Sequence, residues 1–183
     1  MITLKNNCLA LIGMTGSGKT SVGRIVASRI GACFVDLDAE IVARHGEIRT
    51  IFDEQGEEAF RRIECETLSA ILQEKKESLC VIACGGGLPV WYPSRKLLCG
   101  NATVIWLKRG LHTVKEDSPM LKRPPINGDL ATYKKLLTKR YPLYRASADF
   151  AVYNSYPQRT AKLIVKKLEE MSENQIKGEI EPC

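Results

Sequence analysis

The sequence predicts an α/β fold in which five short strands form one parallel sheet with helices on both of its faces. Short, almost continuously apolar segments, which are typical of buried parallel strands, alternate with segments whose apolar residues recur at helical spacing. A glycine-rich loop lies between the first apolar segment and the first helical one. Alternation of this kind is typical of sheets whose functional site lies at the carboxyl ends of the strands.

The expected strands and helices alternate along the chain. Apolar runs predict strands over residues 8–12, 33–35, 79–83, 103–107 and 150–152. Apolar residues spaced three and four apart predict helices over about residues 21–30, 57–75, 130–144 and 159–171. Right-handed crossovers between parallel strands then place these helices on both faces of the sheet.

Length and composition indicate a single domain. The chain has 183 residues, and we expect one domain over residues 1–171 and a mobile polar tail over 172–183. No apolar run is long enough to span a bilayer and no signal segment opens the chain, so we expect a cytoplasmic protein without a membrane partner. The seven cysteines lack the paired spacing of a zinc site, and we expect free thiols.

The formal net charge of +6 is open to two interpretations. Nucleic-acid binding is one, but the sequence contains no basic run interleaved with aromatic residues. Cations that face phosphates and an anionic substrate are the interpretation that we favour. The absence of an exposed heptad pattern favours a monomer.

A phosphate-binding loop is predicted directly after the first strand. The segment Gly13-Met14-Thr15-Gly16-Ser17-Gly18-Lys19-Thr20 carries every fixed residue of this motif. Its glycines let the backbone approach an anion, and its amides converge on a phosphate at the start of a helix. Lys19 can reach the β- and γ-phosphates, and the Thr20 hydroxyl can ligate Mg²⁺. A loop that is glycine-rich by chance is disfavoured by the strand before it and the helix after it. We therefore expect a nucleoside triphosphate to bind at Thr15, Gly16, Ser17, Gly18, Lys19 and Thr20.

Two carboxylates follow the second predicted strand. Asp36 and Asp38 flank Leu37, and alternate residues of an extended segment lie on one side, so both carboxylates can face the site. Asp36 can hold Mg²⁺ or its waters, and Asp38 can orient or deprotonate an acceptor hydroxyl. Alternatively, Asp38 caps a helix that starts at about residue 39.

An ion pair and a run of glycines complete the candidate site. Arg61 and Glu64 are three residues apart in a predicted helix and therefore share a face. They form either a surface salt bridge or a fixed arginine whose planar fork binds a carboxylate. Gly85-Gly86-Gly87 follows the third predicted strand and forms either a turn or a place where a small ligand lies against bare backbone.

The segment over residues 115–129 has no apolar periodicity. It carries Pro119, Pro124 and Pro125 together with the cations Lys122 and Arg123. A loop of this length in a compact domain is often a functional lid, and we expect a lid over the phosphates.

Together these motifs resemble the shikimate kinase family. The resemblance covers about residues 9–168. The motifs that carry it are the phosphate loop, Asp36-Leu37-Asp38, the Gly-Glu-x-x-Phe-Arg-x-x-Glu segment from Gly56 to Glu64, the triple glycine and Lys139-Arg140-Tyr141-Pro142-Leu143-Tyr144. It implies a three-layer P-loop kinase fold with a small substrate-binding region and a lid loop. It also implies ATP-dependent phosphorylation of the 3-hydroxyl of shikimate, with Mg²⁺ as the cofactor.

The resemblance implies a role for each candidate residue. The two arginines of the substrate site would meet the carboxylate of shikimate, and the aspartate would meet its hydroxyls. The implied shikimate-binding residues are Asp38, Arg61, Gly85, Gly86, Gly87 and Arg140. The implied catalytic residues are Lys19, Asp38 and Arg123, of which Arg123 also contacts ATP, and the implied Mg²⁺ residues are Thr20 and Asp36.

Two positions depart from the family's pattern. The lid reads Arg123-Pro124-Pro125-Ile126 in place of Arg-Pro-Leu-Leu, and the second proline stiffens it. An arginine that often precedes the lid near adenine has no clean match; Lys115 is the nearest cation, and Asn154-Ser155 is an alternative lining of the adenine pocket. Two alternative functions remain. One is a related kinase that phosphorylates gluconate or a nucleoside monophosphate, and the other is a catalytically silent scaffold that binds a nucleotide.

Overall fold

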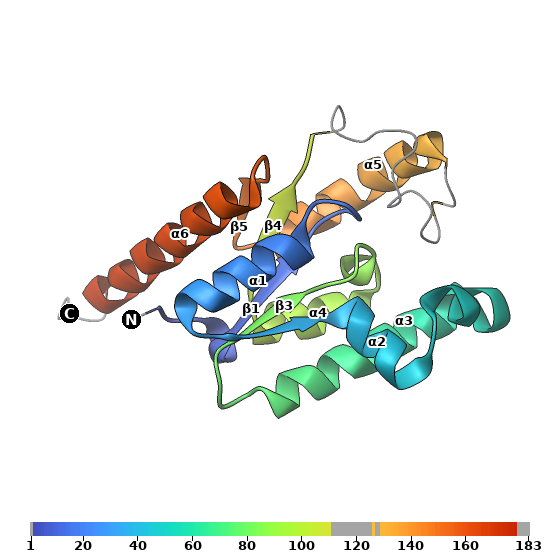
Figure 1. Cartoon of the computed structure of the whole chain (residues 1–183), viewed down its shortest axis with the longest axis horizontal. Coiled ribbons are helices and arrows are strands. Elements are labelled where there is room, and N and C mark those ends of the chain that lie inside the picture. The colour runs from blue at the N-terminus through green and yellow to red at the C-terminus, as the bar shows by residue number, and fades with distance from the viewer. Residues whose placement is uncertain (1, 111–125, 127–128, 179–183) are drawn as a thin grey trace.

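A five-stranded sheet organises the computed structural model, which describes residues 2–110, 126 and 129–178, with the backbone alone over 174–178 (Figure 1). The strands are β1 (Cys8–Ile12), β2 (Cys33–Asp36), β3 (Cys80–Ala83), β4 (Thr103–Lys108) and β5 (Phe150–Tyr153). They lie in the order β2-β3-β1-β4-β5, and every neighbouring pair is parallel. The prediction of a five-stranded parallel sheet is confirmed.

Helices cover both faces of this sheet, and every residue of the central strand β1 is therefore buried. One face packs against α1 (Lys19–Ile30) and α6 (Pro157–Gly178), and its core includes Leu9, Leu11, Val26 and Ile164. The other face packs against α3 (Ile48–Glu74), α4 (Tyr92–Asn101) and α5 (Leu130–Ser147), as Figure 1 shows. The structure thus has three layers, as expected.

The set of helices predicted from apolar periodicity lacks two that the structure contains, although the alternative interpretation of Asp38 as a cap implied the first of them. They are α2 (Leu37–His45) and α4, and the short 3-10 helices η1 (Lys5–Asn7) and η2 (Leu88–Val90) accompany them. Each of the two α-helices buries only two side chains, Leu37 and Ile41 in α2 and Ser94 and Leu98 in α4, so their apolar periodicity is too short to read from the sequence.

The long helix α3 begins earlier than the prediction at residue 57. Gly56 lies inside it with a φ of 83° and a ψ of 173°, so the helix is kinked there. The predicted segment corresponds to the part after the kink, and the first part, with α2, lies beyond the carboxyl end of β2 at the right of Figure 1.

The C-terminal helix α6 extends past the domain end predicted at residue 171. It continues to Gly178, and Ser172 is buried, where its hydroxyl accepts a hydrogen bond from the Thr3 amide at 2.8 Å. The remainder of the predicted tail, residues 179–183, lies outside the described residues. Within the described residues, no helix has the length and apolar character needed to cross a membrane.

Candidate active site

The phosphate loop connects β1 to α1, at the carboxyl edge of the sheet. Gly18 precedes the helix with a φ of 88°, and no side chain caps the first turn. Gly13 has a φ of 143°, and a Cβ placed on it would lie 2.4 Å from the Leu107 carbonyl oxygen. These glycines therefore allow a backbone path on which the start of α1, which no side chain caps, can meet an anion.

Two polar side chains of α1 lie at this loop. Lys19 Nζ donates to the carbonyl oxygens of Gly13 at 2.8 Å and Met14 at 3.0 Å. Thr20 Oγ1 donates to Asp36 Oδ2 at 2.7 Å, so α1 and the end of β2 bring a hydroxyl and a carboxylate together.

The Thr20–Asp36 pair has the chemistry of a magnesium site. Mg²⁺ prefers oxygen ligands and usually takes one or two protein carboxylates together with waters and substrate phosphates. Among the described residues there is no group of three or more His, Cys, Asp or Glu side chains that could hold a metal by itself. A single hydroxyl–carboxylate pair beside a phosphate loop therefore fits a cation that arrives with a nucleotide.

The segment Asp36-Leu37-Asp38 is not extended, contrary to the prediction. β2 ends at Asp36, and α2 begins at Leu37. The helix cap is Asp36 and not Asp38: its side chain accepts from the Ala39 amide at 3.4 Å. Leu37 is fully buried, and Asp38 on the first turn of α2 still lines the site.

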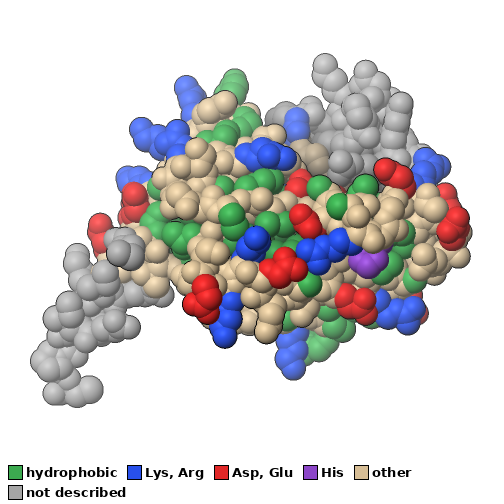
Figure 2. All heavy atoms as spheres, turned by 60° about the horizontal axis from the view of Figure 1, so that its bottom comes forward, with side chains coloured by type: hydrophobic (Ala, Val, Ile, Leu, Met, Phe, Trp, Pro, Cys, Tyr) green, Lys and Arg blue, Asp and Glu red, His purple; other side chains and the backbone are tan. Residues whose placement is uncertain are grey.

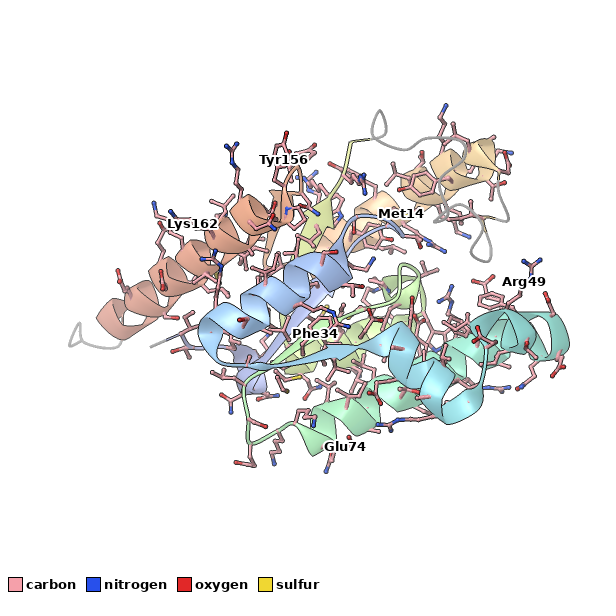
Figure 3. The ribbon with its side chains drawn as sticks, viewed as in Figure 1. Met14, Phe34, Arg49, Glu74, Tyr156 and Lys162 are labelled. Carbon is pink, nitrogen blue, oxygen red and sulfur yellow. The ribbon has the colours of Figure 1, made fainter. Side chains whose placement is uncertain are left out.

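Two cavities meet at this edge of the sheet. The larger, of about 630 Å³, is lined by α2, α3, the triple glycine and α5. The smaller, of about 290 Å³, is lined by the phosphate loop, including Lys19 and Thr20. Residues that line both are Thr15, Asp36, Asp38 and Gly86. In Figure 3, Met14 marks the phosphate loop, and Arg49, which lines the larger cavity, marks the first part of α3.

Arg61 and Glu64 form a buried ion pair in the wall of the larger cavity. Arg61 Nη1 lies 2.7 Å from Glu64 Oε2, and its Nη2 lies 3.0 Å from Glu57 Oε1. Arg61 is 4% exposed and Glu64 is 0% exposed, so the pair is not the surface salt bridge of the alternative interpretation. Burial lowers the pKa of Arg61, but the two glutamates outweigh it and raise the pKa overall.

Burial also shifts the pKa of Glu64. It raises the pKa from 4.5 to about 6, although the attraction of Arg61 opposes the shift. Glu64 therefore remains ionised at neutral pH and gains a proton in mildly acidic solution.

This shift predicts a pH-dependent stability. Between about pH 4.5 and 6 the folded chain holds a proton on Glu64 that the unfolded chain has released, so the free energy of unfolding falls as the pH rises through this window. The expected fall is on the order of 2 kcal/mol. Denaturant unfolding of the parent and of Glu64→Gln across this range should show the loss of this component in the variant. Identical pH dependence in the two chains would contradict it.

The three glycines make room for this ion pair. A Cβ on Gly85 would lie 2.3 Å from Glu64 Oε1, and a Cβ on Gly87 would lie 2.3 Å from Arg61 Nη2. All three glycines also line the larger cavity. Because these glycines lack side chains, they leave room for the charged side chains of the cavity wall and for a ligand in the cavity.

Arg140 reaches the same cavity from α5, next to Tyr144. Arg140 is 4% exposed, and its Nη1 donates to the Gly86 carbonyl oxygen at 3.2 Å. The Tyr144 hydroxyl donates to the same oxygen at 2.5 Å. The buried Nε atoms of Arg61 and Arg140 have no hydrogen-bond partner among the described residues. Two arginines that line one cavity suit an anionic ligand.

The structure adds residues that the sequence did not single out. Phe52 and Phe60 line the larger cavity with ring centroids 4.6 Å apart, and the kink at Gly56 separates them. The Phe-Arg motif contained Phe60, but nothing in the sequence paired it with Phe52. Of the predicted lid over residues 115–129, only residues 126 and 129 are described, so Arg123 and Lys115 lie outside the described residues.

A family model for shikimate kinase matches residues 15–172 of this chain. The chain belongs to the shikimate kinase family. The match includes Asp36, Asp38, Arg61, the triple glycine and Arg140, so the resemblance drawn from the motifs is confirmed.

Curated shikimate kinases are similar to this family member over most of its length. The enzyme of Nitrosomonas europaea is 35% identical over 87% of this chain and 75% of that protein. The enzyme of Thermodesulfovibrio yellowstonii is 35% identical over 90% of this chain and 96% of that protein.

Solved structures confirm that this chain has the P-loop kinase fold. The shikimate kinase from Acinetobacter baumannii in complex with shikimate has a TM-score of 0.77 and 29% identity, and the match covers 92% of this chain and 95% of that chain. The shikimate kinase from Aquifex aeolicus has a TM-score of 0.74, with coverage of 90% and 98%. A gluconokinase from Sinorhizobium meliloti has a TM-score of 0.62 at 20% identity, which supports the fold alone.

Proposed function

We propose that this chain transfers the γ-phosphoryl group of ATP to the 3-hydroxyl of shikimate, giving shikimate 3-phosphate and ADP in aromatic amino acid (chorismate) biosynthesis. The observation that carries the proposal is the junction of the two cavities. The smaller cavity is lined by the phosphate loop and Lys19, as a nucleotide site requires, and the larger cavity is lined by the two buried arginines, Arg61 and Arg140. Asp38 lines both, where an acceptor hydroxyl and a γ-phosphate would meet.

The larger cavity suits a small alicyclic acid. The Arg61 and Arg140 guanidinium groups would bind its carboxylate, since planar forks match carboxylate geometry. Phe52 and Phe60 give the cavity an apolar wall for the ring. The relative from Acinetobacter baumannii was solved with shikimate, which supports this choice of acceptor.

Asp38 would act as the general base. It accepts the proton of the 3-hydroxyl while the hydroxyl oxygen forms a bond to the γ-phosphorus and the bond from phosphorus to the ADP oxygen breaks. Lys19 would turn from the loop carbonyls to the β- and γ-phosphates, and Arg123 would supply a further cation. Holding acceptor and phosphate at one junction provides the positioning on which phosphoryl transfer depends.

Thr20 and Asp36 would hold Mg²⁺. When bound, the ion neutralises charge on the phosphate oxygens. The Thr20–Asp36 contact supports this role because it already places both oxygen donors beside the phosphate loop.

Partners and location complete the proposal. We infer a cytoplasmic monomer that acts on ATP and shikimate, with no nucleic-acid or membrane partner. On the face drawn in Figure 2, basic and acidic side chains are interspersed over the described residues, unlike the continuous basic stripe of a nucleic-acid-binding surface.

An acceptor comparison tests this function. ADP release from Mg-ATP should be saturable with shikimate and should stay at the background rate with gluconate, with a nucleoside monophosphate or without acceptor. Turnover on gluconate alone would replace the proposed acceptor. Silence with every acceptor, in folded protein that binds ATP, would favour the scaffold interpretation.

A further inference from the structure

The phosphate loop is held from outside by side chains that are remote in sequence. Every carbonyl oxygen from Gly13 to Ser17 accepts a hydrogen bond from a side chain. Lys19 serves the first two. The other donors, after β4, in α5 and after β5, are Arg109 to Gly16, Tyr133 to Thr15 at 3.3 Å, and Asn154 to Ser17 at 2.8 Å.

The planarity of the peptide bond gives these contacts a consequence for phosphate binding. The carbonyl of one residue and the N–H of the next point in opposite directions. A donor that fixes the Ser17 carbonyl on the outside of the loop therefore aims the Gly18 N–H toward its inner side. That N–H lies at the start of α1, the kind of position at which helix N-termini bind anions.

Asn154 is itself held in place by several hydrogen bonds. Its Nδ2 donates to the Ser17 carbonyl at 2.8 Å, and its Oδ1 accepts from the Thr160 hydroxyl at 3.0 Å. Thr160 is 4% exposed in the first turn of α6, and the backbone N–H of Asn154 donates to the Lys108 carbonyl oxygen at 2.9 Å. Both ends of the Asn154 amide are thus engaged within the protein.

The Asn154 side chain also packs against the loop backbone. A Cβ on Gly18 would lie 2.3 Å from Asn154 Nδ2. Gly18 is therefore required twice, for its φ of 88° and for the space that the amide occupies. Packing and hydrogen bonding therefore both favour the orientation that the peptide between Ser17 and Gly18 has in the structure.

We propose that Asn154 is a positioning residue for the phosphate loop, which sets nucleotide affinity without touching the nucleotide. It acts through the Ser17–Gly18 peptide, and Thr160 fixes the direction of its amide. This role differs from the lining of the adenine pocket that the sequence suggested for Asn154. The inference rests on the proposed function only for the identity of the ligand as a nucleotide phosphate.

Two variants test this role through MgADP affinity, measured by titration calorimetry. Asn154→Ala removes the donor and leaves the Ser17 carbonyl without it, and we expect about tenfold weaker binding. Asn154→Asp keeps the shape and can still accept from Thr160, but it places a carboxylate against the carbonyl and near the phosphates. We expect Asn154→Asp to bind more weakly than Asn154→Ala.

Asn101→Ala is the matched control. Asn101 Nδ2 donates to the Leu97 carbonyl at 2.8 Å, the same type of bond, at the amino end of β4. Its loss should leave MgADP affinity unchanged. MgADP affinity within about twofold of the parent in both Asn154 variants would overturn the inference, whatever their thermal midpoints.

The binding assay contains no acceptor, so it separates this inference from the proposed function. A parent chain that binds MgADP but does not turn over shikimate would contradict the function, while the Asn154 comparison would still decide the positioning role. A parent chain that does not bind MgADP would overturn both.

Discussion

Asp38→Asn should abolish turnover while sparing ATP binding. Asparagine has nearly the same shape as aspartate but cannot take a proton from the acceptor hydroxyl. General-base catalysis contributes about 10²–10⁴-fold, and we expect a loss of kcat in this range. Steady-state kinetics and MgADP titration measure the two quantities separately.

Glu170→Gln is the matched control for the loss of a carboxylate. Glu170 lies on α6, where it pairs with Lys166 at 3.6 Å and is 54% exposed. Its turnover should equal that of the parent. Normal turnover in Asp38→Asn would contradict the assignment of Asp38 as the base, and a parallel loss of MgADP affinity would show that Asp38 acts on the nucleotide site instead.

Arg61→Ala should damage both stability and substrate binding. The variant leaves Glu64 buried without its cation, and breaking a buried ion pair in this way costs about 3–5 kcal/mol of the free energy of unfolding. It also removes one of the two forks proposed for the substrate carboxylate, so the KM for shikimate should rise about tenfold or more. Denaturant unfolding and steady-state kinetics measure the two effects.

A double variant separates these two roles of Arg61. Arg61→Ala with Glu64→Gln leaves no unpaired buried charge, so a large part of the lost stability should return while the KM for shikimate stays high. Arg62→Ala removes the neighbouring exposed arginine and should change neither quantity. Recovery of a parental KM in the double variant would show that Arg61 matters for folding alone.

The parts of the fold that depend on local patterns could be predicted from the sequence. The strands were predictable because each is a short apolar run, and the phosphate loop because its residues are consecutive. The burial of Arg61 with Glu64 followed only as one of two alternatives, because a spacing of three gives a shared helix face and not the side of the protein that it faces.

Features that depend on contacts between residues far apart in the sequence could not be predicted. The residues Asp36-Leu37-Asp38 are compatible with the end of a strand and with the start of a helix. In the structure, the Asp36 side chain caps a helix that begins at Leu37. Tyr133, Arg109 and Asn154 converge on the phosphate loop from positions 93 to 137 residues away. The sequence singled out only Asn154 among them, and for another role, because these contacts exist only once β4, β5 and α5 surround the loop.

The measurement that tests the central claim most directly is detection of the product. The chain is incubated with Mg-ATP and shikimate, and the products are followed by ³¹P NMR and mass spectrometry. We predict ADP and a shikimate phosphate monoester in equal amounts, with the phosphate on the 3-hydroxyl, and formation of the monoester slower by about 10²-fold or more with Asp38→Asn. Formation of ADP and inorganic phosphate without a phosphorylated acceptor would contradict the account.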